Sequence, residues 1–154
     1  MIFLHIIYHC VGGAHSSSIA AAVHLNMLPI HPRPTASDLL NIPFYDTLES
    51  IDRGKIFLRG FDEYGNAVYN MSRQFIPHLL IPAILDMWKV LEQKEENILF
   101  VNTMPCVNIW MKIGGFSSRR LKWVSFGRPI VTRGTLLAYD NLVNIVLETK
   151  SKLD

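Results

Sequence analysis

A short segment near the start of the chain combines a thiol, glycines and hydroxyl groups. Cys10 is followed by Gly12 and Gly13, and then by Ser16 and Ser17. A thiolate is a strong nucleophile, glycines allow a tight turn whose N–H groups face inward, and serine hydroxyls donate hydrogen bonds. This spacing predicts a loop that binds a phosphate-type anion, with Cys10 as the nucleophile. The alternative is a small apolar cysteine at a strand end, with glycines that serve only the turn.

Two histidines flank this segment, and each has a candidate role. His9 is placed to polarise the neighbouring thiol, and His15 to donate to a bound oxyanion. Packing within the loop is the alternative for both. We therefore predict catalytic roles for Cys10, His9 and His15. Anion binding is predicted for the loop residues Gly12, Gly13, Ala14, Ser16 and Ser17.

A cluster of arginines in the second half of the chain is a further candidate for anion binding. Arg119, Arg120 and Arg128 follow a second apolar strand and its helix. If they reach the same sheet edge, they neutralise a multiply charged ligand. The alternative is a solvated basic face.

Metal binding is a third interpretation of the loop, because imidazole and thiolate are common transition-metal ligands. The chain has no CxxC or HExxH spacing, so we predict no metal and no cofactor. Cys106 is either a second active thiol or a buried cysteine. Asp62 and Asp140 are general acids only if the fold brings them near Cys10, and a turn or surface role is the alternative.

The elements around the loop predict how it is positioned. Residues 2–8 form a continuous apolar run, the pattern of a strand covered on both faces, and residues 16–27 follow a helical period that Pro29 ends. Residues 97–102 are a second such strand, and Pro105 lies at the start of the next helix. Ligands of parallel α/β sheets bind beyond the carboxyl ends of strands, which is where the Cys10 loop lies.

The remaining segments complete the predicted fold. Thr35 and Asp38 have the spacing of a capping box at the start of a short helix, and a β-hairpin is expected around a turn at residues 62–66. A long helix, a short strand and a closing helix are expected at residues 72–92, at 128–131, and from Thr132 or Thr135 onward. We predict one three-layer α/β domain over residues 1–154, with a mostly parallel sheet, helices on both faces and a hairpin insertion.

The composition narrows the choice of partner. The 154 residues are 49% hydrophobic and 18% charged, which is typical of a folded chain, and the net charge of +2 favours neither nucleic acid nor a membrane surface. No stretch reaches the roughly 20 apolar residues of a membrane span. Two cysteines make no disulfide framework, so we predict a cytoplasmic protein. The expected partner is a small anionic or phosphorylated ligand, and a protein partner is a further possibility.

The loop resembles two known phosphate loops. In low-molecular-weight protein tyrosine phosphatases, an N-terminal strand runs into a cysteine, five residues, an arginine and a serine. Cys10, Gly12 and Ser17 match that pattern, while Ser16 stands at the position of the phosphate-clamping arginine. The loop is equally similar to the phosphocysteine loop of phosphotransferase IIB proteins, through Cys10, Gly13, Ser16 and Ser17. Both resemblances imply phosphate binding.

The whole chain resembles an uncharacterised Firmicutes family, domain of unknown function 3189. The segments that carry this resemblance are residues 8–10 with 12–17, 62–66, 105–108, 114–116, 127–129 and 134–135. The family implies no activity. Two functions stay open at this point: a cysteine-dependent phosphatase-like or phosphotransfer enzyme, and a non-catalytic regulatory or interaction module that uses the same loop to sense a ligand.

Overall fold

A mostly parallel four-stranded sheet is the centre of the fold. The computed structural model describes residues 3–153. The strands are β1 (His5–Cys10), β2 (Ile56–Phe61), β3 (Ala67–Ser72) and β4 (Ile98–Asn102), in the order β2-β3-β1-β4. β1 is parallel to both β3 and β4, and β2 pairs antiparallel with β3. The parallel sheet and the hairpin are therefore confirmed.

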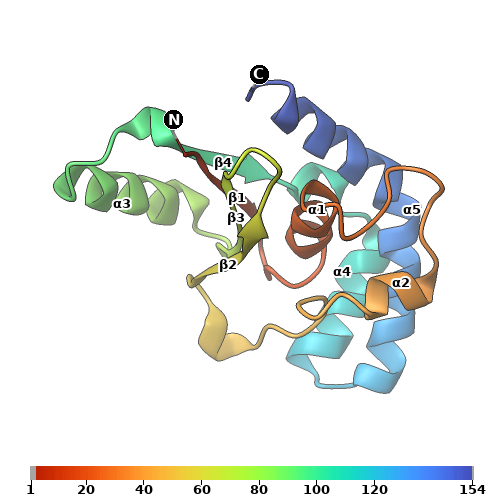
Figure 1. Cartoon of the computed structure of the whole chain (residues 1–154). Coiled ribbons are helices and arrows are strands. Elements are labelled where there is room, and N and C mark those ends of the chain that lie inside the picture. The colour runs from red at the N-terminus through yellow and green to blue at the C-terminus, as the bar shows by residue number, and fades with distance from the viewer. Residues whose placement is uncertain (1–2, 154) are drawn as a thin grey trace.

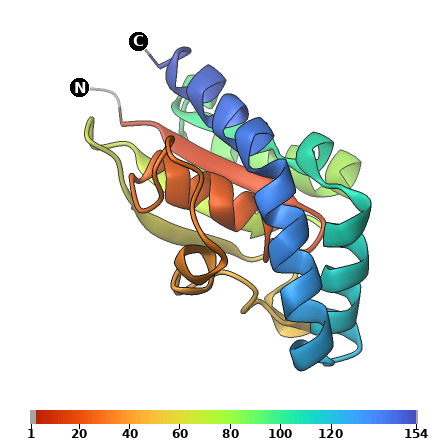
Figure 2. The ribbon, with the colours of Figure 1, turned by 90° about the vertical axis from the view of Figure 1, so that its right-hand side faces the viewer.

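Helices cover both faces of this sheet. They are α1 (Ser16–His24), α2 (Ala36–Leu40), α3 (Pro77–Val90), α4 (Ile109–Gly115) and α5 (Val124–Lys150). α1 and α5 lie on one side of the sheet, and α3 lies on the other (Figure 1). Figure 2 shows α5 running beside α1 over the sheet. The predicted three-layer architecture is confirmed. Within the described chain, none of the helices is both long and apolar enough for a membrane span.

The two faces of β1 meet different neighbours, because side chains alternate along a strand. Ile6 and Tyr8 belong to the main hydrophobic core, together with residues of α1 and α5. On the other face, the ring of His5 packs edge-on against Trp88 of α3. Both faces of the strand are thus covered, as its continuous apolar sequence predicts.

The predicted strand at residues 128–131 is wrong, because this segment lies inside α5. The helix begins at Val124, upstream of both predicted starts. Val131 is buried against Met111 of α4. A Cβ atom on Gly127 would lie 2.4 Å from the backbone nitrogen of Ser118, so the two helical segments approach closely at this glycine. This packing outweighs the β propensity of a short run of β-branched residues.

The predicted helix at residues 72–92 begins too early. Ser72 is the last residue of β3, where it pairs with Cys10, and α3 starts at Pro77. The Ser72 hydroxyl donates to the carbonyl of Val11 at 2.9 Å instead of capping a helix. α1 is also shorter than predicted and ends at His24. The capping box at the start of α2 is confirmed.

Candidate functional site

The Cys10 loop, residues 10–15, lies where the winding of the sheet reverses. The chain passes from β1 to β3 on one side and then returns to β4 on the other side of β1. The carboxyl ends of β1 and β4 therefore border the crevice where ligands bind in open α/β sheets. This places the loop at the expected edge of the sheet.

Gly13 determines the path of this loop. Its φ of +68° lies in the left-handed region, and a Cβ atom there would lie 2.7 Å from the backbone nitrogen of Ser72. Any side chain would meet both backbone strain and a clash with β3. Gly12 differs, because a Cβ atom there would meet nothing within 4 Å. The loop therefore requires glycine at position 13, whereas position 12 has room for a side chain.

The sulfur of Cys10 has two hydrogen-bonding neighbours. The Gly13 N–H donates to Sγ at 3.1 Å, and the hydroxyl of Ser17 lies 3.2 Å from it. The Gly13 N–H is a defined donor to sulfur, whereas in the contact between Cys10 and Ser17 either group can donate. Cys10 is only 5% exposed. The loop therefore holds this thiol in a polar setting that is almost closed to solvent.

The other serines of the first turn of α1 bond to the protein itself. The hydroxyl of Ser16 lies 2.8 Å from that of Thr103, which follows β4 and also donates to the carbonyl of His9. Ser18 donates to the carbonyl of Gly13 at 3.0 Å. Because these hydroxyls are engaged, the remaining donors are the backbone N–H groups at the start of α1, which no side chain caps in the described structure.

His9 lies on the opposite face of β1 from Cys10. Its ring packs edge-on against Phe100 of β4 and is 4% exposed. Burial, together with the charge of Arg73, lowers the pKa of His9 to about 4, so the ring is neutral at pH 7. Its Nδ1 has no hydrogen-bond partner within residues 3–153. His9 thus contacts a different set of groups from the thiol.

Arg73 is a residue that the sequence analysis missed. It directly follows β3, and its backbone N–H donates to the carbonyl of Cys10 at 3.0 Å. Arg73 is 8% exposed, and its Nη1 donates to the carbonyl of Gln74. Nε has no partner, and no carboxylate of the described residues forms an ion pair with this guanidinium. The backbone of Arg73 therefore contacts the Cys10 loop, and its buried guanidinium, whose charge acts on His9, has no counter-ion among the described residues.

The other end of the loop is attached to a buried carboxylate, Asp46. Its oxygens accept hydrogen bonds from the Nε2–H of His15 at 2.8 Å and from Ser118 at 2.8 Å. The Nε atoms of Arg119 and Arg128 lie 3.0 and 2.8 Å from it. Burial alone would raise the pKa of Asp46, but the hydrogen bond and charge of His15, with Arg128 and Ser118, lower it to about 2. We call these five residues the Asp46 cluster.

The predicted arginines thus reach the loop only through Asp46. Arg119 and Arg128 pair with the carboxylate of Asp46, which also bonds His15. The backbone N–H of Asp46 donates to the carbonyl of Ala14. Arg120 is exposed and has no recorded contact with the loop. No sequence pattern pointed to Asp46, which lies 31 residues after His15 in an irregular segment.

The remaining candidates lie elsewhere. Asp62 is in the β2–β3 turn and bonds His24 at 3.1 Å, and Asp140 pairs with Arg33 on the surface. Cys106 is buried, and burial raises the pKa of its thiol. Within the described chain, no three histidine, cysteine or acidic side chains are grouped as metal ligands would be.

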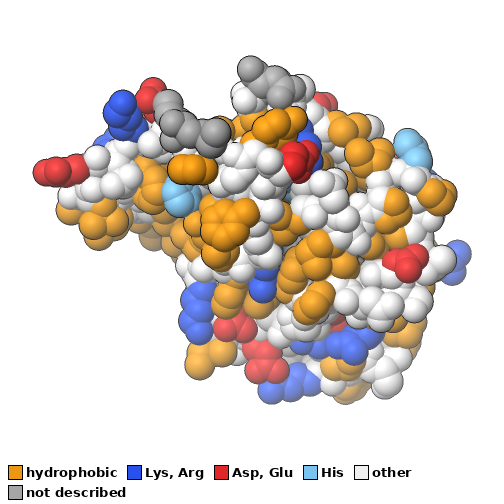
Figure 3. Space-filling view, viewed as in Figure 1, with side chains coloured by type: hydrophobic (Ala, Val, Ile, Leu, Met, Phe, Trp, Pro, Cys, Tyr) orange, Lys and Arg blue, Asp and Glu red, His pale blue; other side chains and the backbone are white. Residues whose placement is uncertain are grey.

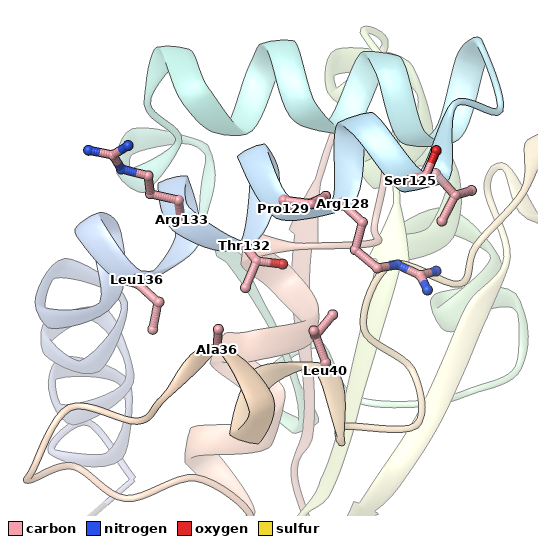
Figure 4. A pocket seen from close by; sticks show the side chains of 9 residues that line it. Ala36, Leu40, Ser125, Arg128, Pro129, Thr132, Arg133 and Leu136 are labelled. Carbon is pink, nitrogen blue, oxygen red and sulfur yellow. The ribbon is translucent and has the colours of Figure 1, made fainter.

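A separate pocket of about 440 Å³ lies between α2 and α5. Ala36, Leu40, Pro129, Thr132 and Leu136 are among its lining residues, and Figure 4 shows Arg128 at one end. Arg128 is the one lining residue that also belongs to the Asp46 cluster. The pocket is mainly apolar and does not include the Cys10 loop.

The fold and site define an α/β protein with a buried thiol in the first loop at the carboxyl edge of a parallel sheet. A comparison with known families adds the classification. The chain belongs to the family described as protein of unknown function, DUF3189, whose model matches residues 5–151. No curated protein and no solved structure matches the chain.

Proposed function

We propose that the chain binds a phosphate-type anion or a phosphorylated small ligand at the Cys10 loop. The observation that carries this proposal is Arg73, whose backbone N–H bonds Cys10 and whose buried guanidinium has no carboxylate partner among the described residues. Buried charges in proteins are paired, because an unpaired ion loses its hydration without compensation. A bound anion supplies the missing counter-ion. In this proposal Arg73 supplies the guanidinium that the loop sequence lacks.

Cys10 is the nucleophile in the catalytic form of this proposal. Its sulfur attacks the phosphorus of a phosphate ester, an S–P bond forms, the ester P–O bond breaks, and the leaving alcohol takes up a proton. Gly13 and Ser17, which lie within hydrogen-bond distance of the sulfur, stabilise the attacking thiolate. Water or an acceptor alcohol then releases the phosphoryl group from sulfur.

Site-resolved alkylation of the two cysteines tests anion binding. Iodoacetamide labelling is followed by mass spectrometry with and without inorganic phosphate or orthovanadate. At phosphate concentrations about ten times the dissociation constant, labelling of Cys10 is expected to slow about tenfold. Cys106 is the internal control, because it is a buried thiol outside the loop. Equal rates at Cys10 with and without either anion would contradict the proposal.

A non-catalytic binding module is the second candidate, and the burial of Cys10 favours it. A thiol that is 5% exposed and already hydrogen-bonded serves to support the loop without reacting. Turnover of para-nitrophenyl phosphate separates the two functions. The enzyme loses turnover in Cys10→Ser and keeps the phosphate-induced rise in melting temperature. The binding module shows no turnover in the wild type and keeps that rise in Cys10→Ala.

A further inference from the structure

Helix α3 is mainly apolar and yet buries none of its residues. Its 14 residues include only three polar ones, His78, Asp86 and Lys89. Trp88 contacts His5 of the sheet, but no residue of α3 is fully covered. The three polar residues share one side of the helix, and an apolar side of a helix normally packs against another element. The exposed apolar residues of α3, Leu79, Met87 and Val90, therefore indicate a covering that the described residues do not supply.

The exposed side chains of α3 continue onto the neighbouring face of the sheet. We define the α3 surface by Leu58, Phe61, Phe75, Leu79, Met87 and Val90, which are 48–72% exposed. Residues that pair across neighbouring strands point to the same face of the sheet. Leu58 pairs with Tyr69, and Tyr69 pairs with Ile7, whose side chain is on the same face as that of His5. The β2 residues of this surface therefore point to the side of the sheet that α3 covers. Figure 3 shows hydrophobic side chains over α3 and over the sheet beside it.

The charge of this surface limits the kind of partner. Asp86 and Lys89 have opposite signs, and the guanidinium of Arg59 lies over the ring of Phe57 at 4.9 Å and does not cover the α3 side. A nearly neutral surface offers nothing to a polyanion or to anionic lipid, which require clustered Lys and Arg. A second copy of the chain presents the same neutral apolar surface and meets no repulsion.

The exposed apolar area supplies a large part of what a dimer interface buries. A buried aromatic side chain covers roughly 150–250 Å², so Phe61 and Phe75, at 66% and 70% exposed, each offer roughly 100–175 Å². A fully buried aliphatic side chain covers roughly 60–120 Å², so the other four bring the apolar total to roughly 350–630 Å². With a polar rim, this approaches the about 800 Å² that each partner buries in a standard interface.

We propose that the α3 surface is the interface of a homodimer. In a twofold dimer the same surface of each copy packs against that of the other, so each interface residue is buried once in each copy. This proposal is independent of the proposed function, because the α3 surface shares no residue with the Cys10 loop.

Sedimentation velocity between about 1 and about 100 μM tests this interface. The wild type is expected to dimerise in this range. The double variant Leu79→Glu, Val90→Glu is expected to weaken dimerisation at least about 100-fold, because each substitution puts two charges into the interface. Leu137→Glu is the matched control, since Leu137 is 55% exposed on α5. Circular dichroism checks that all variants fold.

Hydrogen exchange on the wild type keeps the test independent of the variants. Amides of α3 are expected to exchange more slowly at the high concentration than at the low one. A wild-type chain that is monomeric at about 100 μM overturns the proposal, and so does an unchanged dimer in the double variant. A monomer that sediments with phosphatidylcholine vesicles also overturns it and assigns the surface to lipid.

Discussion

The Asp46 cluster and the pair formed by His9 and Arg73 contrast in one respect. Both place a histidine and arginine near the Cys10 loop. In the Asp46 cluster a buried carboxylate pairs with the cations, whereas Arg73 has no carboxylate partner among the described residues. The charges of the first group are paired within the protein, whereas the second group contains no acidic side chain among the described residues. This difference teaches that a cation near a loop indicates a ligand site only when its pairing within the protein is known.

Removing the carboxylate should have the largest effect. Asp46→Asn leaves Arg119 and Arg128 without a counter-ion and removes the carboxylate that His15 bonds, so we expect a loss of about 3–5 kcal/mol in the free energy of unfolding. Urea denaturation measures it. Asp140→Asn is the control, because its pair with Arg33 is exposed, and should cost less than about 1 kcal/mol. Similar losses in both variants would contradict the structural role of Asp46.

Low pH should reduce the free energy of unfolding through His9, which lies in the pair formed by His9 and Arg73. Burial and Arg73 lower the pKa of His9 to about 4, so between pH about 4 and its ordinary value of 6.5 the unfolded state binds more protons. Stability is expected to rise with pH across this window by up to about 3 kcal/mol. His9→Phe should flatten the rise, leaving a smaller part from buried His24, whose pKa is also lowered. An unchanged pH profile in His9→Phe would refute this account.

Replacing the unpaired arginine should have the smallest effect on stability and the sharpest effect on binding. Arg73→Met removes a buried charge and keeps an aliphatic chain of similar length. In buffer without phosphate or sulfate we expect stability to be unchanged or to rise by up to about 2 kcal/mol. The rise in melting temperature with phosphate should disappear. Arg119→Met is the comparison, and a loss of stability in both variants would mean that Arg73 has a protein partner.

The Cys10 loop could be predicted because its signals are local. A continuous apolar strand, two glycines and a serine-rich helix start are neighbours in sequence, and Gly13 does occupy a position that excludes side chains. The role of Arg73 was missed because Ser72 was taken as a helix cap, which removed Arg73 from the sheet edge. The strand pairing of Ser72 with Cys10 shows where Arg73 lies.

The sequence alone determined the sheet type, the hairpin, the family and the location of the thiol loop, because periodicity, turn residues and short motifs act over a few neighbouring residues. Tertiary structure alone decided that residues 128–131 are helical and that Asp46 pairs with Arg119 and Arg128. It also decided that Arg73 has no counter-ion among the described residues. These outcomes depend on packing and on charge pairs between distant segments, which a local pattern does not encode.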